Sequence, residues 1–151
     1  MQKTQVQGQV EIEVKYTFKK VRSQSPELKG KIEMRPGEQA YTFELEVPVK
    51  SFVSSDPEFD RHLQEVTEVE LYPLAQASGD FSRDLLNKDQ GALRALIDFH
   101  GVKRSYEIVV ENKGSKASFI LDLDSHGIKR PSLLGIKIRN EVLLSFNLNW
   151  S

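Results

Sequence analysis

The chain of 151 residues has the length of one domain and can bury one substantial core. Its 21 basic and 22 acidic residues give a formal net charge of −1, which excludes a global electrostatic attraction to nucleic acid. Cysteine is absent, which excludes disulfides and thiolate nucleophiles, and no apolar run approaches the roughly 20 residues of a membrane-spanning helix. We therefore expect a single globular domain over residues 1–151, without an integral membrane segment.

Alternation of apolar and polar residues, the pattern of a half-buried strand, dominates the first third of the chain. It begins in residues 10–18, where the apolar face consists of Val10, Ile12, Val14, Tyr16 and Phe18. The segment Ser23-Gln24-Ser25-Pro26 then predicts a break. Strands over residues 28–34 and 41–49 predict a hairpin around the Arg35-Pro36-Gly37-Glu38 turn.

One short helix is predicted between residues 55 and 70. Ser55 or Asp56 can cap its start, and Pro57 suits the first helical position. The apolar residues that share one face at helical spacing are Phe59, Leu63 and Val66.

Strands and turns also alternate through the second half of the chain. Strands are predicted over residues 74–81, 93–99, 106–110, 117–123 and 142–150. Turns are predicted at residues 87–91, 100–101 and 112–115, and residues 125–138 form a looser segment. About eight strands and one short helix indicate an all-β fold, an antiparallel lipocalin-like β-barrel, and a barrel of this size is filled by side chains or holds one small ligand.

The polar residues form no recognisable catalytic or metal-binding motif. His62, His100 and His126 do not have the spacing of a metal site, even with nearby aspartates, and the chain has no Gly-x-Ser-x-Gly elbow and no phosphate-binding loop. We predict that His100 is a turn residue whose ring caps backbone groups. We expect no catalytic residue, no metal and no cofactor.

Two polar clusters have alternative interpretations. Asp60-Arg61-His62 is either a solvated helix face or a contact for a ligand headgroup at the barrel mouth. The cationic residues Lys129, Arg130, Lys137 and Arg139 are either solvated or positioned to meet a pyrophosphate or a membrane surface.

Several stretches, taken in order, resemble the YceI-like family of bacterial lipid-binding proteins. The most specific are Gly91-Ala92-Leu93 followed by His100-Gly101-Val102-Lys103, although the lysine arrives one position early. The others are Leu28-Lys29-Gly30-Lys31-Ile32, Val49-Lys50-Ser51-Phe52-Val53, Asp60-Arg61-His62-Leu63, Tyr72-Pro73 and the run from Arg130 to Ile138. The resemblance implies a periplasmic or secreted protein whose signal peptide has been removed. The sequence alone is also compatible with the cytoplasm.

The resemblance further implies that the barrel binds a polyisoprenoid or the tail of an isoprenoid quinone, as a non-catalytic carrier or store. We predict that the tail contacts an inward stripe formed by Phe43, Leu45, Phe99, Phe119, Leu121, Phe146 and Leu148. One alternative is an enzyme that acts on an isoprenoid or quinone through His100 or His126. Another is a filled barrel that serves as a protein-interaction module, and association into a homodimer is open.

Overall fold

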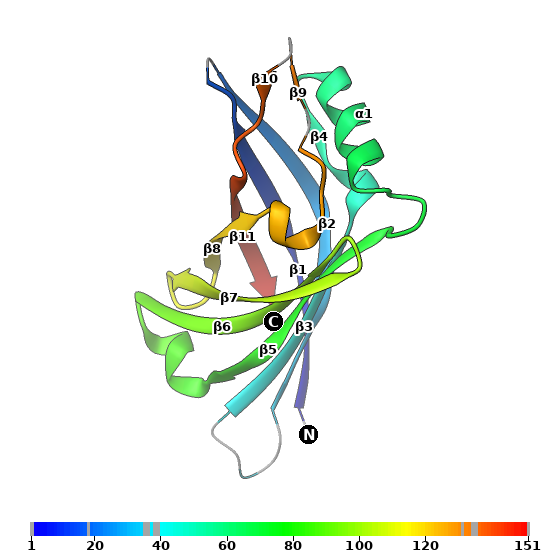
Figure 1. Cartoon of the computed structure of the whole chain (residues 1–151). Coiled ribbons are helices and arrows are strands. Elements are labelled where there is room, and N and C mark those ends of the chain that lie inside the picture. The colour runs from blue at the N-terminus through cyan, green and yellow to red at the C-terminus, as the bar shows by residue number, and fades with distance from the viewer. Residues whose placement is uncertain are drawn as a thin grey trace.

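Eight antiparallel strands form a closed barrel in the computed structural model, which describes residues 2–17, 19–34, 37, 40–130, 132–133 and 136–150 (Figure 1). The barrel strands are β1 (Gln2–Lys15), β2 (Lys20–Met34), β3 (Ala40–Pro48), β5 (Leu74–Ser82), β6 (Gln90–Phe99), β7 (Val102–Glu111), β8 (Lys116–Asp122) and β11 (Glu141–Trp150). They are hydrogen-bonded in the order β1-β11-β8-β7-β6-β5-β3-β2, and β2 pairs with β1 to close the ring. The predicted fold class is confirmed.

Several short elements lie outside this ring. Strand β4 (Val53–Ser54) pairs with β2 at Ser23 and Gln24. Strand β9 (Ser132–Leu133) pairs with β10 (Ile136–Lys137) at the end of the barrel where α1 (Pro57–Val66) lies (Figure 1). Within the described residues, 3₁₀ helices span Val49–Ser51, Arg83–Asn87 and Asp124–His126.

Strand β2 contains the segment where the sequence predicts a break. Ser23 and Ser25 are buried on its inner face, and the β1–β2 register shifts because Gly8 pairs with Leu28 whereas Val10 pairs with Ser25. Pro26 and Glu27 of β2 thus lie opposite the single residue Gln9 of β1, and this one extra residue forms a bulge at Pro26, which is exposed and needs no ladder donor there. The predicted break is therefore wrong, because proline and serine mark a bulge within one long strand.

Two further predictions for this region concern a strand end and a turn. Strand β1 begins at Gln2 and ends at Lys15, so Tyr16 lies beyond it, and Phe18 lies outside the described residues. Of the turn predicted at residues 35–38, the structure describes Gly37, which has a positive φ of 79°.

Helix α1 begins as the sequence predicts. The Asp56 carboxylate accepts hydrogen bonds from the backbone N–H groups of Glu58 (3.1 Å) and Phe59 (3.3 Å), and Pro57 occupies the first turn. Phe59 and Leu63 are buried and Val66 is half-buried. The Asp60 carboxylate accepts hydrogen bonds from the backbone N–H (3.0 Å) and hydroxyl (2.6 Å) of Ser54, so it ties α1 to β4.

The turns of the second half differ in how closely they follow the prediction. His100 and Gly101 form a two-residue turn between β6 and β7, with positive φ values of 57° and 71°. Residues 112–115 connect β7 to β8 as predicted, with Asn112, Lys113 and Gly114 at positive φ. Near the predicted turn at residues 87–91, however, the chain forms the 3₁₀ helix Arg83–Asn87, and β6 begins at Gln90.

The barrel wall is incompletely paired between β7 and β8. Among the described residues, β7 pairs with β6 over its whole length but pairs with β8 only through Val109, Val110 and Glu111. The 3₁₀ helix Asp124–His126 contacts β7 in the remaining space. The imidazole of His126, fully buried, fills this seam between the strands.

Candidate functional site: the apolar interior

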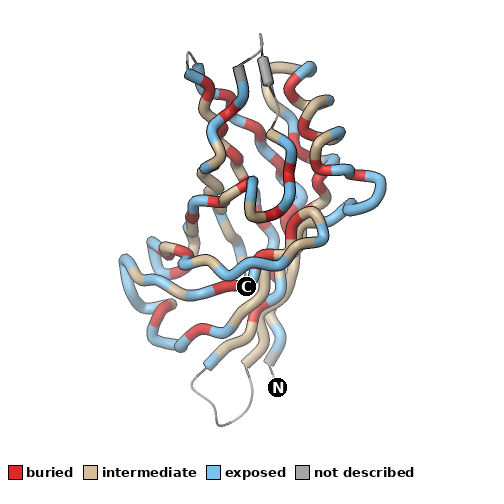
Figure 2. Tube along the Cα trace, in the orientation of Figure 1, coloured by how far each residue is buried: buried red, intermediate tan, exposed pale blue. Residues whose placement is uncertain are grey.

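Two apolar cavities lie inside the barrel. We call the one lined in part by α1 the upper cavity, because α1 lies at the top of Figure 1, and the one lined in part by Val6 of β1 and Trp150 of β11 the lower cavity. The upper cavity is lined by residues that include Val14, Phe52, Leu63, Phe99, Leu121, Ile128 and Ile138. The lower cavity is lined by residues that include Val6, Phe43, Phe81, Leu85, Ile108, Leu148 and Trp150. Figure 2 shows buried residues interspersed with intermediate and exposed ones along the strands.

Each cavity has a volume of about 70 Å³. This exceeds the space needed by a water molecule, roughly 10–15 Å³, but is well below the ~300 Å³ of a typical small-molecule pocket. The interior is therefore neither completely filled by side chains nor open as one wide channel. A long ligand can enter only if side chains move.

The two cavities meet at three residues that line both, namely Leu45, Ala77 and Phe146. Leu45 and Ala77 are paired across β3 and β5, whereas Phe146 comes from β11 on the opposite side of the ring. We call these three residues the waist. The interior is therefore divided into two chambers at the level where Leu45 and Phe146 project from opposite walls.

All seven residues of the predicted inward stripe line these chambers. Phe99, Phe119 and Leu121 line the upper one, Phe43 and Leu148 the lower one, and the other two belong to the waist. Their role as ligand contacts stays a prediction. The stripe omitted lining residues from β1, from β5 and from the 3₁₀ helix at 83–87. It also omitted Trp150 at the end of β11, which could have been found because it continues the alternation of Phe146 and Leu148.

The lower chamber is closed by the 3₁₀ helix Arg83–Asn87 and the end of β11. Leu85 packs over Gly91, and Leu86 and Trp150 lie over Gly114, where an added Cβ would meet both side chains. Leu85 is 8% exposed. The upper chamber is covered by α1 through Leu63 and Val66, and by Ile128 and Ile138 from the last connection.

His126 anchors the polar contacts in the seam beside the upper chamber. Its Nδ1 lies 2.9 Å from the carbonyl oxygen of Val102 and 3.1 Å from that of Phe99, so Nδ1 carries the proton and donates. Nε2 then accepts from the Tyr106 hydroxyl at 2.8 Å. Burial of the ring lowers the pKa of His126 below its usual value, which favours the neutral form.

His100 holds the α1–β5 connection against the β6–β7 turn. Its Nδ1 lies 2.9 Å from the carbonyl oxygen of His126, and its Nε2 lies 2.7 Å from the Glu68 carboxylate. The Tyr72 ring packs edge-on against the imidazole at a centroid distance of 4.9 Å. The predicted capping role of His100 is confirmed.

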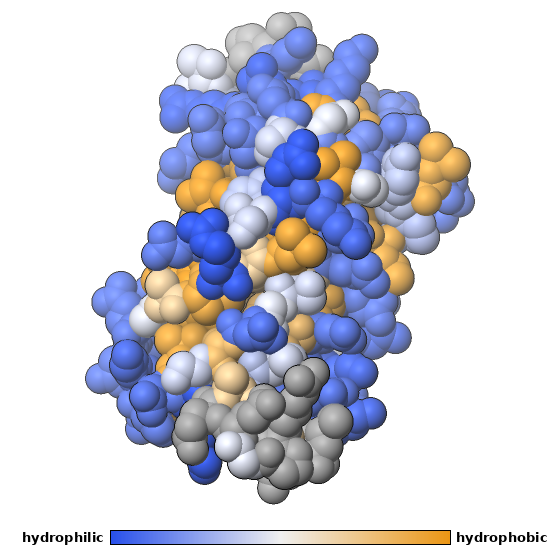
Figure 3. All heavy atoms as spheres, turned by 60° about the horizontal axis from the view of Figure 1, so that its bottom comes forward, coloured by the Kyte–Doolittle hydropathy of each residue, from blue (hydrophilic) through white to orange (hydrophobic). Residues whose placement is uncertain are grey.

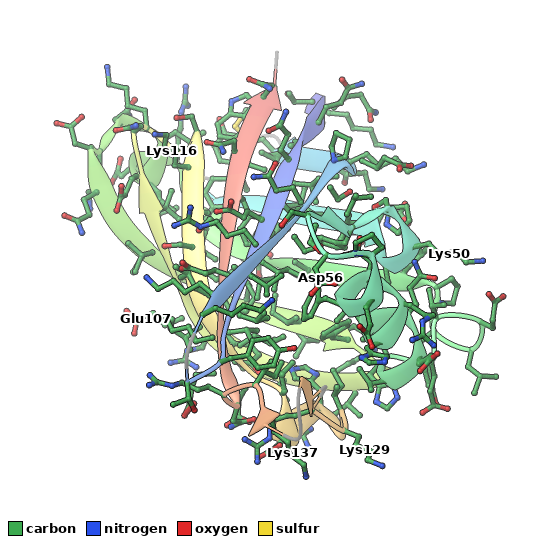
Figure 4. The ribbon with its side chains drawn as sticks, turned by 90° about the horizontal axis from the view of Figure 1, so that it is seen from above. Lys50, Asp56, Glu107, Lys116, Lys129 and Lys137 are labelled. Atoms are coloured by element: carbon green, nitrogen blue, oxygen red, sulfur yellow. The ribbon has the colours of Figure 1, made fainter. Side chains whose placement is uncertain are left out.

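Hydrophilic residues cover most of the outside of the barrel. Seen from below, hydrophobic residues appear between them in a band (Figure 3). Seen along the barrel from above, Lys50, Glu107, Lys116, Lys129 and Lys137 lie at the periphery and point away from the centre (Figure 4). Charge is therefore kept on the outer surface, and the interior lining is apolar.

The described part of the chain holds no group of three histidine, cysteine or carboxylate side chains close enough together to bind a metal ion. None of its described helices is both long and apolar enough to span a membrane.

Solved structures with this fold come from several bacteria. A polyisoprenoid-binding domain from Saccharophagus degradans, implicated in plant cell wall breakdown, is 11% identical and superposes with a TM-score of 0.74 over 98% of this chain and 97% of its own. BcnA from Burkholderia cenocepacia is 12% identical, with a TM-score of 0.69 over 93% and 94% of the two chains. The YceI protein of Campylobacter jejuni is 11% identical, with a TM-score of 0.59 over 83% and 81%.

A comparison with curated protein sequences gave no match. The YceI-like domain, in contrast, matches residues 2–150, nearly the whole chain. The chain belongs to the YceI-like family.

Proposed function

We propose that this protein binds an isoprenoid lipid, a polyisoprenoid or the tail of an isoprenoid quinone, in the barrel interior and carries or stores it. The observation that carries the proposal is the pair of apolar chambers joined at the waist, which together extend along the inside of the barrel. The polyisoprenoid-binding domain that shares the fold over nearly its whole length supports the choice of ligand class.

Hydrophobic transfer supplies the affinity in this proposal. Burying apolar surface contributes about 25 cal/mol per Å², so a flexible hydrocarbon tail needs no specific polar partner. Binding must widen the narrow chambers, and the aromatic rings and leucine side chains along the lining can rotate to do so. A headgroup would remain outside the apolar lining, near one end of the barrel.

The proposal includes no catalytic step. His126 is buried with both ring nitrogens hydrogen-bonded to protein groups, and both ring nitrogens of His100 also face protein acceptors. Neither imidazole lines a chamber. Their engagement favours a carrier over an enzyme that uses either ring as an acid or base. We place the carrier in the periplasm or outside the cell, in keeping with the lipid cargo.

The direct test is to purify the protein without detergent, extract it with organic solvent and identify the extract by mass spectrometry. Native mass spectrometry of the intact protein gives the number of lipids bound per monomer or homodimer. We expect a stoichiometric isoprenoid. A stable, empty protein that takes up no added isoprenoid quinone contradicts the proposal and favours the filled-barrel interaction module.

Phe119→Asp tests whether the interior is the binding site. Phe119 is 5% exposed and lines the upper chamber, so the substitution places a carboxylate in an apolar lining and should reduce lipid retention severalfold. The neighbouring Ile120, 53% exposed, supplies a matched control because Ile120→Asp adds the same charge on the outer face. Lipid per folded protein, measured by mass spectrometry, should fall only for Phe119→Asp. Equal retention in both variants would show that the lipid does not contact Phe119.

A further inference from the structure

The waist is the level at which the two apolar chambers of the interior meet. The chambers on its two sides have equal volumes of about 70 Å³, and only Leu45, Ala77 and Phe146 line both of them among the described residues. A short tail can therefore occupy one chamber without passing the waist. A long tail must pass it, whichever end of the barrel admits the ligand.

Two of the waist residues, Leu45 and Phe146, have large side chains. The Phe146 ring stacks on Phe119, with centroids 5.9 Å apart and planes at 10°. Leu45 lies on β3, two residues from the buried Phe43. If the β5 residues at this level also had large side chains, no passage would remain between the chambers.

The third position is small. Ala77 faces Phe146 from the opposite side of the ring, and Gly79 follows it on the same face of β5, directly against the Phe43 ring. The small residues of β5, where the sequence alternation is weak, thus lie at the level where the two chambers meet. Space at the waist is available because the side chain of Ala77 ends at Cβ.

We infer that Leu45, Ala77 and Phe146 determine the length of the isoprenoid tail that the protein accepts. This inference rests on the proposed function and assigns these three residues as its specificity determinants. Tails confined to one chamber bind independently of the waist. Longer tails bind only when the Phe146 ring turns aside, so the size of residues 77 and 146 sets the discrimination.

Two variants and one control test the inference. Ala77→Leu narrows the waist, Phe146→Ala widens it, and Ala92→Leu makes the same alanine-to-leucine change on the exposed face of β6. Each purified protein is delipidated and offered an equimolar mixture of two isoprenoid quinones, carrying two and eight isoprene units. Native mass spectrometry reports the ratio of long to short quinone bound, and thermal melting confirms that each variant is folded.

Ala77→Leu should lower the long-to-short ratio at least about tenfold while binding of the short quinone persists, since overpacking a filled site has effects of this size. Phe146→Ala should raise the ratio, and it tests the inference by itself if Ala77→Leu fails to fold. Ala92→Leu should match the wild type. A wild-type ratio in the folded waist variants overturns the inference, whereas a wild-type protein that binds neither quinone overturns the proposed function instead.

Discussion

His126 illustrates how one buried side chain completes the barrel wall. Its ring donates to the carbonyl oxygens that flank the β6–β7 turn and accepts from Tyr106, whose hydroxyl also accepts the backbone N–H of Asp122 at 3.3 Å. The Tyr106 ring stacks on the imidazole at a centroid distance of 5.8 Å. All of these hydrogen bonds can form only while Nε2 of His126 is unprotonated.

This arrangement predicts a pH dependence of stability. Burial lowers the pKa of His126 in the folded state, so below about pH 6.5 the unfolded chain binds the proton more readily and the free energy of unfolding falls as the pH falls. Asp122 does not contribute in this window, because hydrogen bonds from Asn140 and Ser125 lower its pKa further below an ordinary value of 3.8. Urea unfolding at pH 7.5 and pH 5.5 measures the difference.

The control for this prediction replaces a different imidazole. His126→Gln should be less stable overall but should lose less stability between the two pH values than the wild type. His62→Gln, on the half-buried face of α1, should keep the wild-type difference. An unchanged pH difference in His126→Gln would contradict the assignment of the effect to this ring.

At the scale of elements, close approach of neighbouring backbones limits which residues a strand can contain. Gly30 on β2 pairs with Leu45 of the waist, and a Cβ at residue 30 would collide with the backbone carbonyl of Glu44. Gly91 differs because its added Cβ would meet the flexible end of the Leu85 side chain. Backbone cannot move aside without separating two strands, whereas a side chain can rotate.

Gly30→Ala is therefore expected to destabilise the protein strongly, by about 1–3 kcal/mol or more, which is the range for overpacking. Gly91→Ala, the matched substitution, should cost less because Leu85 can adopt another rotamer. Chemical denaturation of both variants beside the wild type checks the order. Equal destabilisation by the two substitutions would contradict the distinction between backbone and side-chain collisions.

At the scale of the whole molecule, a lipid that fills the chambers should stabilise the folded state. A ligand that binds only the folded protein adds about 2.7 kcal/mol at a concentration 100-fold above its Kd. We expect a delipidated protein to melt at a lower temperature and to regain stability when a long-tailed isoprenoid quinone is added. The tail-less quinone is the control, and an equal rise in Tm with both compounds would place the binding outside the apolar interior.

The sequence predicted the fold well because period-two alternation directly reports which face of a strand is buried. Phe119 and Leu121, for example, were expected to face inward and both line the upper chamber. The bulge at Pro26 was misread because a local break signal also fits a strand whose partner shifts register. The waist could not be predicted, since it depends on residues of β3, β5 and β11 that meet only when the ring closes.

The seam between β7 and β8 determines where the barrel can change its circumference. Ten residue pairs join β6 to β7, but three join β7 to β8 among the described residues. Among the described residues, β5 and β6 share four residue pairs, and each remaining neighbouring pair of barrel strands is joined by a longer ladder of backbone hydrogen bonds that enlarging the ring would break. At the seam, the 3₁₀ helix Asp124–His126 and the paired side chains of Tyr106 and His126 form part of the wall, so the fewest backbone hydrogen bonds oppose separation of the strands there. We therefore expect the protein to accommodate a bulky cargo by spreading β7 from β8 and leaving its other strand pairs intact.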